Sequence, residues 1–546
     1  MAGITIRTSE GWTGGDSSGI VVPMVSMLLT FGVWSPTPPF DKVPRNGGAE
    51  SLRRQVLGTG PPALIVFRAG CLSVTLHFSH LMTHLELPRP VHYISTPPSV
   101  VQDLVTPLHL ASFTTNNTMA GDIPTNGDTA TRTAPGAGSE GPTTAAASKR
   151  ELSLATLSVH ADDGISSHRA IAPAMHVSTT FKYHSNPDEL RSGENVDPSA
   201  PGDSHIYSRY SGPNTTRLEA ILSSVLRGPT LTYSSGLSAF HAMLVFLNPK
   251  RVAIGGGYHG CHGVIKVLAK LNGLQQLELD DASLEKLEAG DVLHVETPLN
   301  PTGEARNLAY FRQVASRKGA YLTVDATFAP PPLQDPFALG ADVVMHSGTK
   351  YFGGHSDMLC GTLSLNPKRA DEWMPELLME RCFIGSVMGS MEGWLGVRSL
   401  RTLELRVKRQ SESATKLVAW LDGEVRGNPG GLVGSVVDAV QHASLQTADL
   451  EAGWLREQMP GGFGPVFALL LKDEGDAKRL PSKMGLFHHA TSLGGVESLI
   501  EWRAMSDSGC SKRLLRVSVG VEGWEDLRDD LIQGFEALVK EKKKTV

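Results

Sequence analysis

The chain has 546 residues and a net charge of −6, from 50 lysines and arginines against 56 aspartates and glutamates. This weakly acidic balance offers no basic surface of the kind that binds nucleic acid, so no nucleic-acid partner is expected. Hydrophobic residues make up 40% of the sequence, which is enough for large buried cores. The five cysteines are odd in number and form no C-x-x-C pair, which indicates reduced thiols and a cytoplasmic protein.

The first 118 residues show no regular pattern. Two apolar stretches, residues 19–34 and 63–78, are interrupted by proline or arginine and are short for a membrane span. Neither has the flanks of a signal peptide, so no membrane association is expected. Two interpretations stay open: residues 1–118 form a poorly ordered extension, or translation starts at Met119 and they do not belong to the natural product.

Ordered structure is expected only after a linker. Residues 119–153 are rich in Thr, Ala, Gly and Pro, a composition typical of flexible linkers. Residues 154–216 are predicted to form an N-terminal arm, mostly extended, that lies on another surface. An amphipathic helix then covers residues 218–226, where five apolar residues fall at the i, i+3, i+4, i+7 and i+8 spacing of one face.

Strands and helices alternate in the segment that follows. This alternation predicts an α/β fold with a mainly parallel sheet that is covered on both faces, in a large domain of residues 217–405. Helices are expected over residues 234–246, 259–271 and 308–318, and strands over residues 251–254, 274–279, 292–296, 321–325 and 342–345.

The pattern changes near residue 406. A long helix over residues 407–421, strands over residues 466–471 and 514–519, and a closing helix over residues 524–539 follow one another. These elements predict a smaller C-terminal α/β domain of residues 406–546.

Polar clusters follow several strands of the large domain. They are Gly255–Gly257, Glu296–Asn300, Asp325 and Ser347–Lys350. Because ligands bind at the carboxyl ends of strands in open α/β sheets, these clusters predict one site.

Lys350 is the strongest candidate for covalent chemistry. It follows a short apolar strand and is preceded by the hydroxyls of Ser347 and Thr349. A catalytic amine needs a rigid, partly desolvated turn on which it loses its proton easily. Hydroxyls beside such an amine can hold an anion, so the stretch suggests a Schiff-base lysine next to the phosphate of pyridoxal phosphate.

Three alternatives compete with this interpretation. Gly255–Gly260 matches the G-x-G-x-x-G pattern of an NAD(P)-dependent oxidoreductase, and Asp280 follows at the required distance. A metal site at His259, Cys261 and His262 is not expected, because these residues are too close together to converge on one ion. The third alternative is a descendant without catalytic activity that keeps the fold for binding or assembly.

Over roughly residues 154–540 the chain resembles the Cys/Met-metabolism (trans-sulfuration) family of pyridoxal-phosphate enzymes, which includes cystathionine γ-synthases and cystathionine lyases. The resemblance implies the PLP-dependent transferase fold type I and a homotetramer, a dimer of dimers with shared active sites. Its motifs occur in order at Tyr207–Arg209, Ser235–Ala239, Val295–Pro301, Val324–Phe328, Ser347–Asp357, Val397–Leu403, Ser492–Leu499 and Leu515–Gly520.

The resemblance also implies roles for single residues. Lys350 would bind the cofactor covalently and move protons, Asp325 would pair with the ring nitrogen, and Tyr258 would stack on the ring. The phosphate of the cofactor would be held by Gly236, Leu237, Ser347 and Thr349, and by Tyr207 and Arg209 of the neighbouring subunit. The substrate would be bound by Asn300, Ser492 and Arg516.

The implied activity is β- or γ-elimination, or γ-replacement, on a sulfur-containing or O-acylated amino acid. Cystathionine cleavage and cystathionine synthesis both fit. Several γ-acting members carry an acid just before Ser-Leu-Gly, whereas this chain has Thr491. The choice between attack at Cβ and at Cγ therefore stays open.

Overall fold

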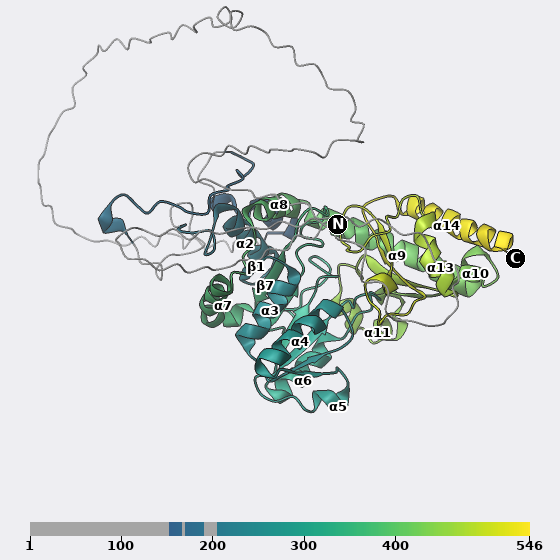
Figure 1. The fold of residues 1–546 in the computed structure, drawn as a ribbon, viewed down its shortest axis with the longest axis horizontal. Coiled ribbons are helices and arrows are strands. Elements are labelled where there is room, and N and C mark those ends of the chain that lie inside the picture. Colours follow the sequence, from purple (N-terminus) through teal and green to yellow (C-terminus); the bar gives the residue numbers. More distant parts are fainter. Residues whose placement is uncertain (1–151, 166–169, 191–204, 546) are drawn as a thin grey trace, which may run out of the picture. The chain divides into compact units, whose positions relative to one another are not determined.

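The computed structural model describes residues 152–165, 170–190 and 205–545, all within one compact unit that comprises residues 138–546 (Figure 1). The predictions for residues 1–118 and for residues 119–151 lie outside the described residues. No helix in the described part of the chain is long and apolar enough to cross a membrane.

A seven-stranded sheet forms the larger of two layers of strands. Its order is β1-β7-β6-β5-β4-β2-β3, and all neighbouring pairs from β3 to β6 are parallel, whereas β7 runs antiparallel to both of its neighbours. The mainly parallel sheet is therefore confirmed. Its strands are β1 (Thr230–Tyr233), β2 (Arg251–Ile254), β3 (Gln275–Leu277), β4 (Val292–Glu296), β5 (Tyr321–Asp325), β6 (Val343–His346) and β7 (Gly361–Leu365).

Both faces of the sheet are buried along its central strands β4, β5 and β6, as their largely apolar sequences predict, whereas the edge strand β3 is largely exposed. Successive residues of one strand point to opposite faces, so Val343 packs in one core cluster and Val344 in another. The helices of this part are α2 (Pro213–Leu226), α3 (Gly236–Leu247), α4 (His259–Asn272), α5 (Asp281–Leu284), α6 (Leu308–Lys318), α7 (Ala370–Ile384) and α8 (Ser390–Leu400).

A second, four-stranded sheet has the order β10-β11-β9-β8 and is antiparallel throughout. It shares a core cluster with the long helices α9 (Leu403–Gly427) and α14 (Trp524–Thr545). Its strands are β8 (Val437–Gln441), β9 (Val466–Leu471), β10 (Leu499–Trp502) and β11 (Leu514–Ser518), and the short helices nearby are α10 (Leu432–Val436), α11 (Thr447–Glu451), α12 (Trp454–Gln458) and α13 (Glu474–Arg479).

The arm differs from its prediction at its start. Residues 154–160 form a helix, α1 (Leu154–His160), so the extended structure expected there is wrong. The side chain of Ser153 caps this helix by accepting a hydrogen bond from the N–H of Thr156, and Leu154 and Leu157 pack on the core. Seven residues are too few to reveal a helical period in the sequence.

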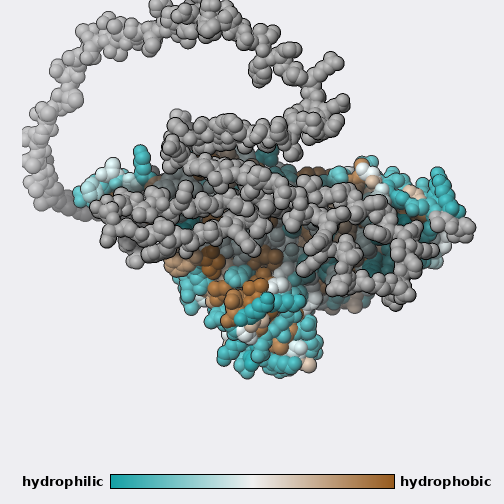
Figure 2. Space-filling view, viewed as in Figure 1, coloured by the Kyte–Doolittle hydropathy of each residue, from teal (hydrophilic) through white to brown (hydrophobic). Residues whose placement is uncertain are grey.

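The rest of the arm leaves large apolar side chains exposed. Ile171 is 98% exposed, and Val177 and Tyr183 are exposed as well. Phe383, at the end of α7, is 77% exposed. Figure 2 shows hydrophobic surface among the described residues on the face that it presents, beside surface that is largely hydrophilic.

Candidate active site

A cavity of about 370 Å³ lies where β4, β5 and β6 end, between the two sheets. Residues from the small sheet, including Arg516 of β11, complete its wall. The structure therefore gathers ten of the residues that the sequence singled out, which are Gly236, Leu237, Tyr258, Asn300, Asp325, Ser347, Thr349, Lys350, Ser492 and Arg516.

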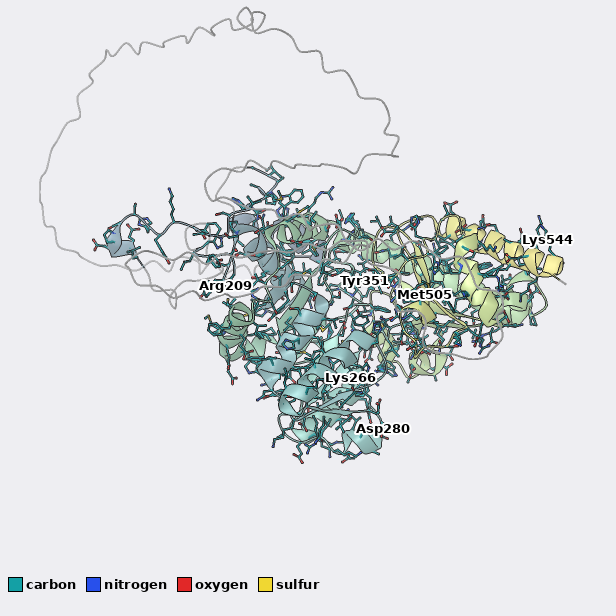
Figure 3. All side chains as sticks on the ribbon, in the orientation of Figure 1. Arg209, Lys266, Asp280, Tyr351, Met505 and Lys544 are labelled. Atoms are coloured by element: carbon teal, nitrogen blue, oxygen red, sulfur yellow. The ribbon has the colours of Figure 1, made fainter. Side chains whose placement is uncertain are left out.

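Tyr207 and Arg209 do not line this cavity. The guanidinium of Arg209 lies 5.0 Å from the centre of the Tyr207 ring, and both residues belong to the arm. Figure 3 shows Arg209 well separated from Tyr351, the neighbour of Lys350.

Lys350 lies in the loop between β6 and β7, with its amine at the cavity. Its Nζ donates a hydrogen bond to Ser492 Oγ at 2.8 Å. Burial and, to a smaller extent, the positive charge of Arg516 lower the pKa of Lys350 to about 8, against the negative charge of Glu501. A good fraction of this amine is therefore neutral near physiological pH, as a nucleophile or proton acceptor requires.

Two carboxyl groups face each other at the ends of β4 and β5. Glu296 and Asp325 are direct neighbours in the parallel ladder, and both are buried. Burial raises the pKa of both, and the charge of Asp325 helps to raise that of Glu296 to about 8. Hydrogen bonds from the Thr327 N–H (2.9 Å) and hydroxyl (2.5 Å) favour the ionised form of Asp325. Because two carboxylates this close disfavour each other's ionisation, Glu296, with its pKa of about 8, retains a proton near neutral pH.

The protonated partner organises the neighbouring loops. Glu296 accepts hydrogen bonds from the N–H groups of Tyr258 and Asn300, both at 2.8 Å. A Cβ at Gly257 would come within 2.3 Å of Glu296 Oε2, so only glycine fits there. Glu296 thereby sets the start of α4, where Tyr258 stands, against the ends of the strands.

Arg516 projects from the middle of β11 into the cavity. Its Nη2 lies 2.6 Å from Glu501 Oε2 and donates to the carbonyl oxygen of Ser492 at 2.8 Å. Its Nη1 donates to Asn300 Oδ1 at 3.3 Å. Burial lowers the pKa of Arg516 to about 10, against the opposing charge of Glu501. The group stays cationic at neutral pH and presents a fork suited to a carboxylate.

The backbone of Ser492 is unusual. Its φ is +84°, in the left-handed region that residues other than glycine rarely adopt. Next to it, a Cβ at Gly494 would come within 2.9 Å of the Lys350 backbone. The loop before β10 is therefore pressed tightly against the lysine loop of the large sheet.

The family model of the Cys/Met metabolism PLP-dependent enzymes matches residues 155–536. The chain belongs to this family. As a member of the Cys/Met metabolism family it is a PLP-dependent enzyme of fold type I, and the predicted α/β fold is confirmed.

Curated relatives and solved structures share this architecture. The chain is 32% identical to a cystathionine β-lyase of Lactococcus lactis over 349 residues, 60% of this chain and 88% of the relative. It is 31% identical to the cystathionine γ-synthase of Escherichia coli over 415 residues, 72% and 99% of the two chains. The crystal structure of cystathionine γ-lyase from yeast matches with a TM-score of 0.61 at 28% identity, covering 71% of this chain and 98% of the other.

The residues at the cavity fit pyridoxal phosphate, the cofactor of the Cys/Met metabolism family. Helix α3 begins at Gly236, and the first N–H groups of a helix have no partner within it and attract phosphate. A Cβ at Gly236 would lie 3.1 Å from Ser347 Oγ, so glycine keeps the space between helix and hydroxyl open. Thr349 is already engaged, since its hydroxyl donates to the Cys360 carbonyl at 3.2 Å.

Gly255–Gly260, which matched the pattern of an NAD(P)-dependent oxidoreductase, packs against other side chains near the site. Arg306 Nη2 donates to the carbonyl of Gly256 at 3.4 Å, and Gly257 packs on Glu296. Asp280 caps the short helix α5, and Figure 3 shows it far from Tyr351. The family match does not support that alternative. Within the described residues, no three His, Cys, Asp or Glu side chains converge as in a metal site.

Several residues at the site were not singled out from the sequence, and Glu501 and Arg503 are the two that carry charge. Glu501 lies opposite Arg516 in the antiparallel pairing of β10 with β11. Arg503 lines the cavity from the turn that follows β10. The short strand β10 was not predicted, and without it nothing places Glu501 beside Arg516.

Proposed function

We propose that this enzyme catalyses β- or γ-elimination, or γ-replacement, on sulfur-containing or O-acylated amino acids, as a cystathionine lyase or a cystathionine γ-synthase does. The observation that carries the proposal is one cavity lined by a lysine with a lowered pKa, a buried carboxylate and a cationic fork. The names of the relatives, which include β-lyases, γ-lyases and γ-synthases, support the same class of reaction.

Asp325 and Lys350 would divide the acid–base work. When bound, pyridoxal phosphate supplies an electron sink for the bonds at the substrate Cα. Asp325, as a carboxylate, would hold the ring nitrogen in its protonated form. Lys350 Nζ would take the proton from Cα and return it, held near Ser492 Oγ between the two transfers. Tyr258, at the cavity wall, would stack on the ring.

Arg516 would bind the α-carboxylate of the substrate. It is buried, cationic and already aligned by Asn300 and the Ser492 carbonyl. A bidentate pair with this guanidinium would fix the substrate on the side of the small sheet and direct Cα towards Lys350. Gly236, Leu237 and Ser347, on the other side, would hold the cofactor phosphate.

The site would be completed by a second copy of the chain, in a dimer of dimers. Tyr207 and Arg209 do not line the cavity of their own chain, and the arm and α7 carry exposed apolar residues such as Ile171 and Phe383. Exposed apolar surface of this kind favours association. The free thiols of Cys261, Cys360, Cys382 and Cys510 agree with a reducing, cytoplasmic environment.

A product assay tests the proposal. The purified holoenzyme is incubated with cystathionine, cysteine, homocysteine or O-acylhomoserine, and the keto acids, thiols and thioethers that form are identified. Borohydride should remove the visible cofactor band and leave the label on Lys350. Protein that lacks this band, binds NAD(P) and converts none of these amino acids would contradict the proposal.

A further inference from the structure

Arg503 is a buried cation at the wall of the active-site cavity. It begins the 3-10 helix η8 (Arg503–Met505), which directly follows β10, and only 2% of it is exposed. A guanidinium does not lose its proton in a protein, so its charge persists in this buried position. A buried charge is costly unless it is closely paired and fully hydrogen-bonded.

Within the described chain, the hydrogen bonds of Arg503 are made by one of its three nitrogens. Its Nη1 donates to Ser506 Oγ at 3.0 Å and to Glu501 Oε2 at 3.3 Å. Its Nη2 lies 3.8 Å from Asp507 Oδ2, and neither Nη2 nor Nε has a hydrogen-bond acceptor among the described residues. The thiol of Cys510, a weak acceptor, is also near enough for the charge of Arg503 to lower its pKa against burial.

Another buried arginine, Arg381, is paired more closely, although its Nε also lacks an acceptor among the described residues. Arg381 contacts the Glu219 carboxylate at 2.6 Å and donates to two backbone carbonyls, at 2.9 and 3.2 Å. Arg503 has no carboxylate that close. The nearest one, Glu501, lies 3.3 Å from Arg503 Nη1 and makes closer contacts with Arg516, at 2.6 Å, and with the Ser506 hydroxyl, at 2.5 Å. Two guanidinium groups at the cavity therefore share one carboxylate.

Asp507 lies between Arg503 and His259 but is held closely by neither. It lies 3.8 Å from Arg503 Nη2 and 3.9 Å from His259 Nδ1, too far for a hydrogen bond to either. Its strong contacts are within its own turn, where it accepts from the Gly509 N–H at 3.0 Å and from the Cys510 thiol at 3.2 Å. An anion in the cavity can therefore bind Arg503 without breaking a close ion pair between Arg503 and Asp507.

We propose that Arg503 binds a second acidic group of the substrate, in addition to the α-carboxylate that Arg516 would take. The Nε–Nη2 edge has no acceptor among the described residues and has the geometry for a bidentate carboxylate, and Arg503 lines the cavity in which the substrate would lie. The substrate class is an amino acid whose side chain or acyl leaving group ends in a carboxylate. This inference rests on the proposed function for the class of reaction.

A matched pair of substrates tests this inference by turnover. O-Succinylhomoserine and O-acetylhomoserine differ chiefly in the terminal carboxylate of the succinyl group. The wild-type enzyme should prefer the succinyl ester in kcat/KM, and Arg503→Met should reduce that preference about tenfold to a hundredfold by raising KM for the succinyl ester alone. Arg503→Lys keeps the charge but lacks the two-pronged donor. Its preference for the succinyl ester should lie between those of wild type and Arg503→Met.

The control is Met505→Gln, on the same short helix but 68% exposed and outside the cavity wall (Figure 3). It should leave the preference unchanged. Equal losses on both esters in Arg503→Met would overturn the inference, because a residue that only supports Arg516 would weaken both. If Arg503→Met does not fold, Arg503→Lys decides: an unaltered preference in that variant also overturns it.

A binding measurement separates this inference from the proposed reaction. Calorimetry of the holoenzyme with glutarate and with butyrate compares a diacid with a monoacid without any turnover. Wild type should bind glutarate about tenfold more tightly or better, and Arg503→Met should lose that difference while binding butyrate as before. Equal binding of both acids by the wild type would refute the role of Arg503. Absence of turnover on every amino acid would refute the proposed function alone.

Discussion

The two sheets contribute to one cavity in different ways. The parallel sheet presents its site residues from the loops and termini that follow β4, β5 and β6, where Glu296, Asp325 and Lys350 stand. The antiparallel sheet presents Arg516 from within a strand, with its partner Glu501 on the next strand. A strand end can hold a reactive group without disturbing the ladder, whereas a charge within a strand needs a partner across it.

The difference separates two tasks. The parallel sheet supplies the groups suited to the cofactor and to proton transfer, and the antiparallel sheet supplies those suited to the substrate. Substitutions at the site residues of the parallel sheet should therefore reduce the rate of the chemical step. Substitutions at the site residues of the antiparallel sheet should mainly reduce substrate affinity. Four experiments examine this division.

Lys350→Ala should have the largest effect. Without its amine the enzyme loses both the covalent anchor and the proton acceptor, so kcat should fall by roughly a thousandfold or more. The side chain makes only the hydrogen bond to Ser492 among those described, so the melting temperature should change little. Steady-state kinetics and circular dichroism check both parts. Activity equal to that of wild type would rule out the lysine mechanism.

Arg516→Lys should mainly raise KM. The lysine keeps the positive charge beside Glu501 but loses the two-pronged contact with a carboxylate, which should raise KM about tenfold to a hundredfold. Arg513→Met, which removes a partly exposed pair with Asp438, is the control and should change KM by less than about twofold. A fall in kcat of Arg516→Lys as large as that of Lys350→Ala would contradict the proposed division of tasks between the two sheets.

The pH dependence of cofactor uptake should reveal the pKa of Lys350. Only the neutral amine attacks the aldehyde, so the rate at which apoenzyme takes up pyridoxal phosphate should rise with pH and level off above about 8. An ordinary lysine would give a midpoint near pH ~10.4. Arg516→Met removes a positive neighbour and should move the midpoint upwards. Stopped-flow absorbance measures both, and a midpoint unaffected by Arg516→Met would contradict the coupling.

Glu296→Gln should change how stability depends on pH. The folded pKa of Glu296, about 8, is above its unfolded value, so its contribution is complete below about pH 4 and is lost as pH rises through 8. Glutamine cannot ionise, so the melting temperature of the variant apoenzyme should fall less between pH 5 and pH 8, by the equivalent of roughly 1–3 kcal/mol. Glu278→Gln, at an exposed carboxylate, is the control and should follow wild type.

Much of the large sheet could be predicted because its strands are short, apolar and followed by polar clusters. Strands β2, β4 and β5 begin and end where the sequence indicated. The site residues that follow β2, β4, β5 and β6 meet at the cavity because parallel strands all end at one edge. The sequence could not place Arg503 or Glu501 in the same way. Their positions depend on β10, four residues long, and on its register with β11, which no local pattern reveals.

The left-handed backbone of Ser492 carries an evolutionary consequence. Holding a serine at φ +84° costs of order 1 kcal/mol relative to glycine, and this residue keeps that conformation while its hydroxyl accepts from Lys350. Selection for heat tolerance alone would favour glycine at position 492, and selection for turnover would restore serine. Homologues adapted to hot environments are where this conflict between robustness and speed should become visible.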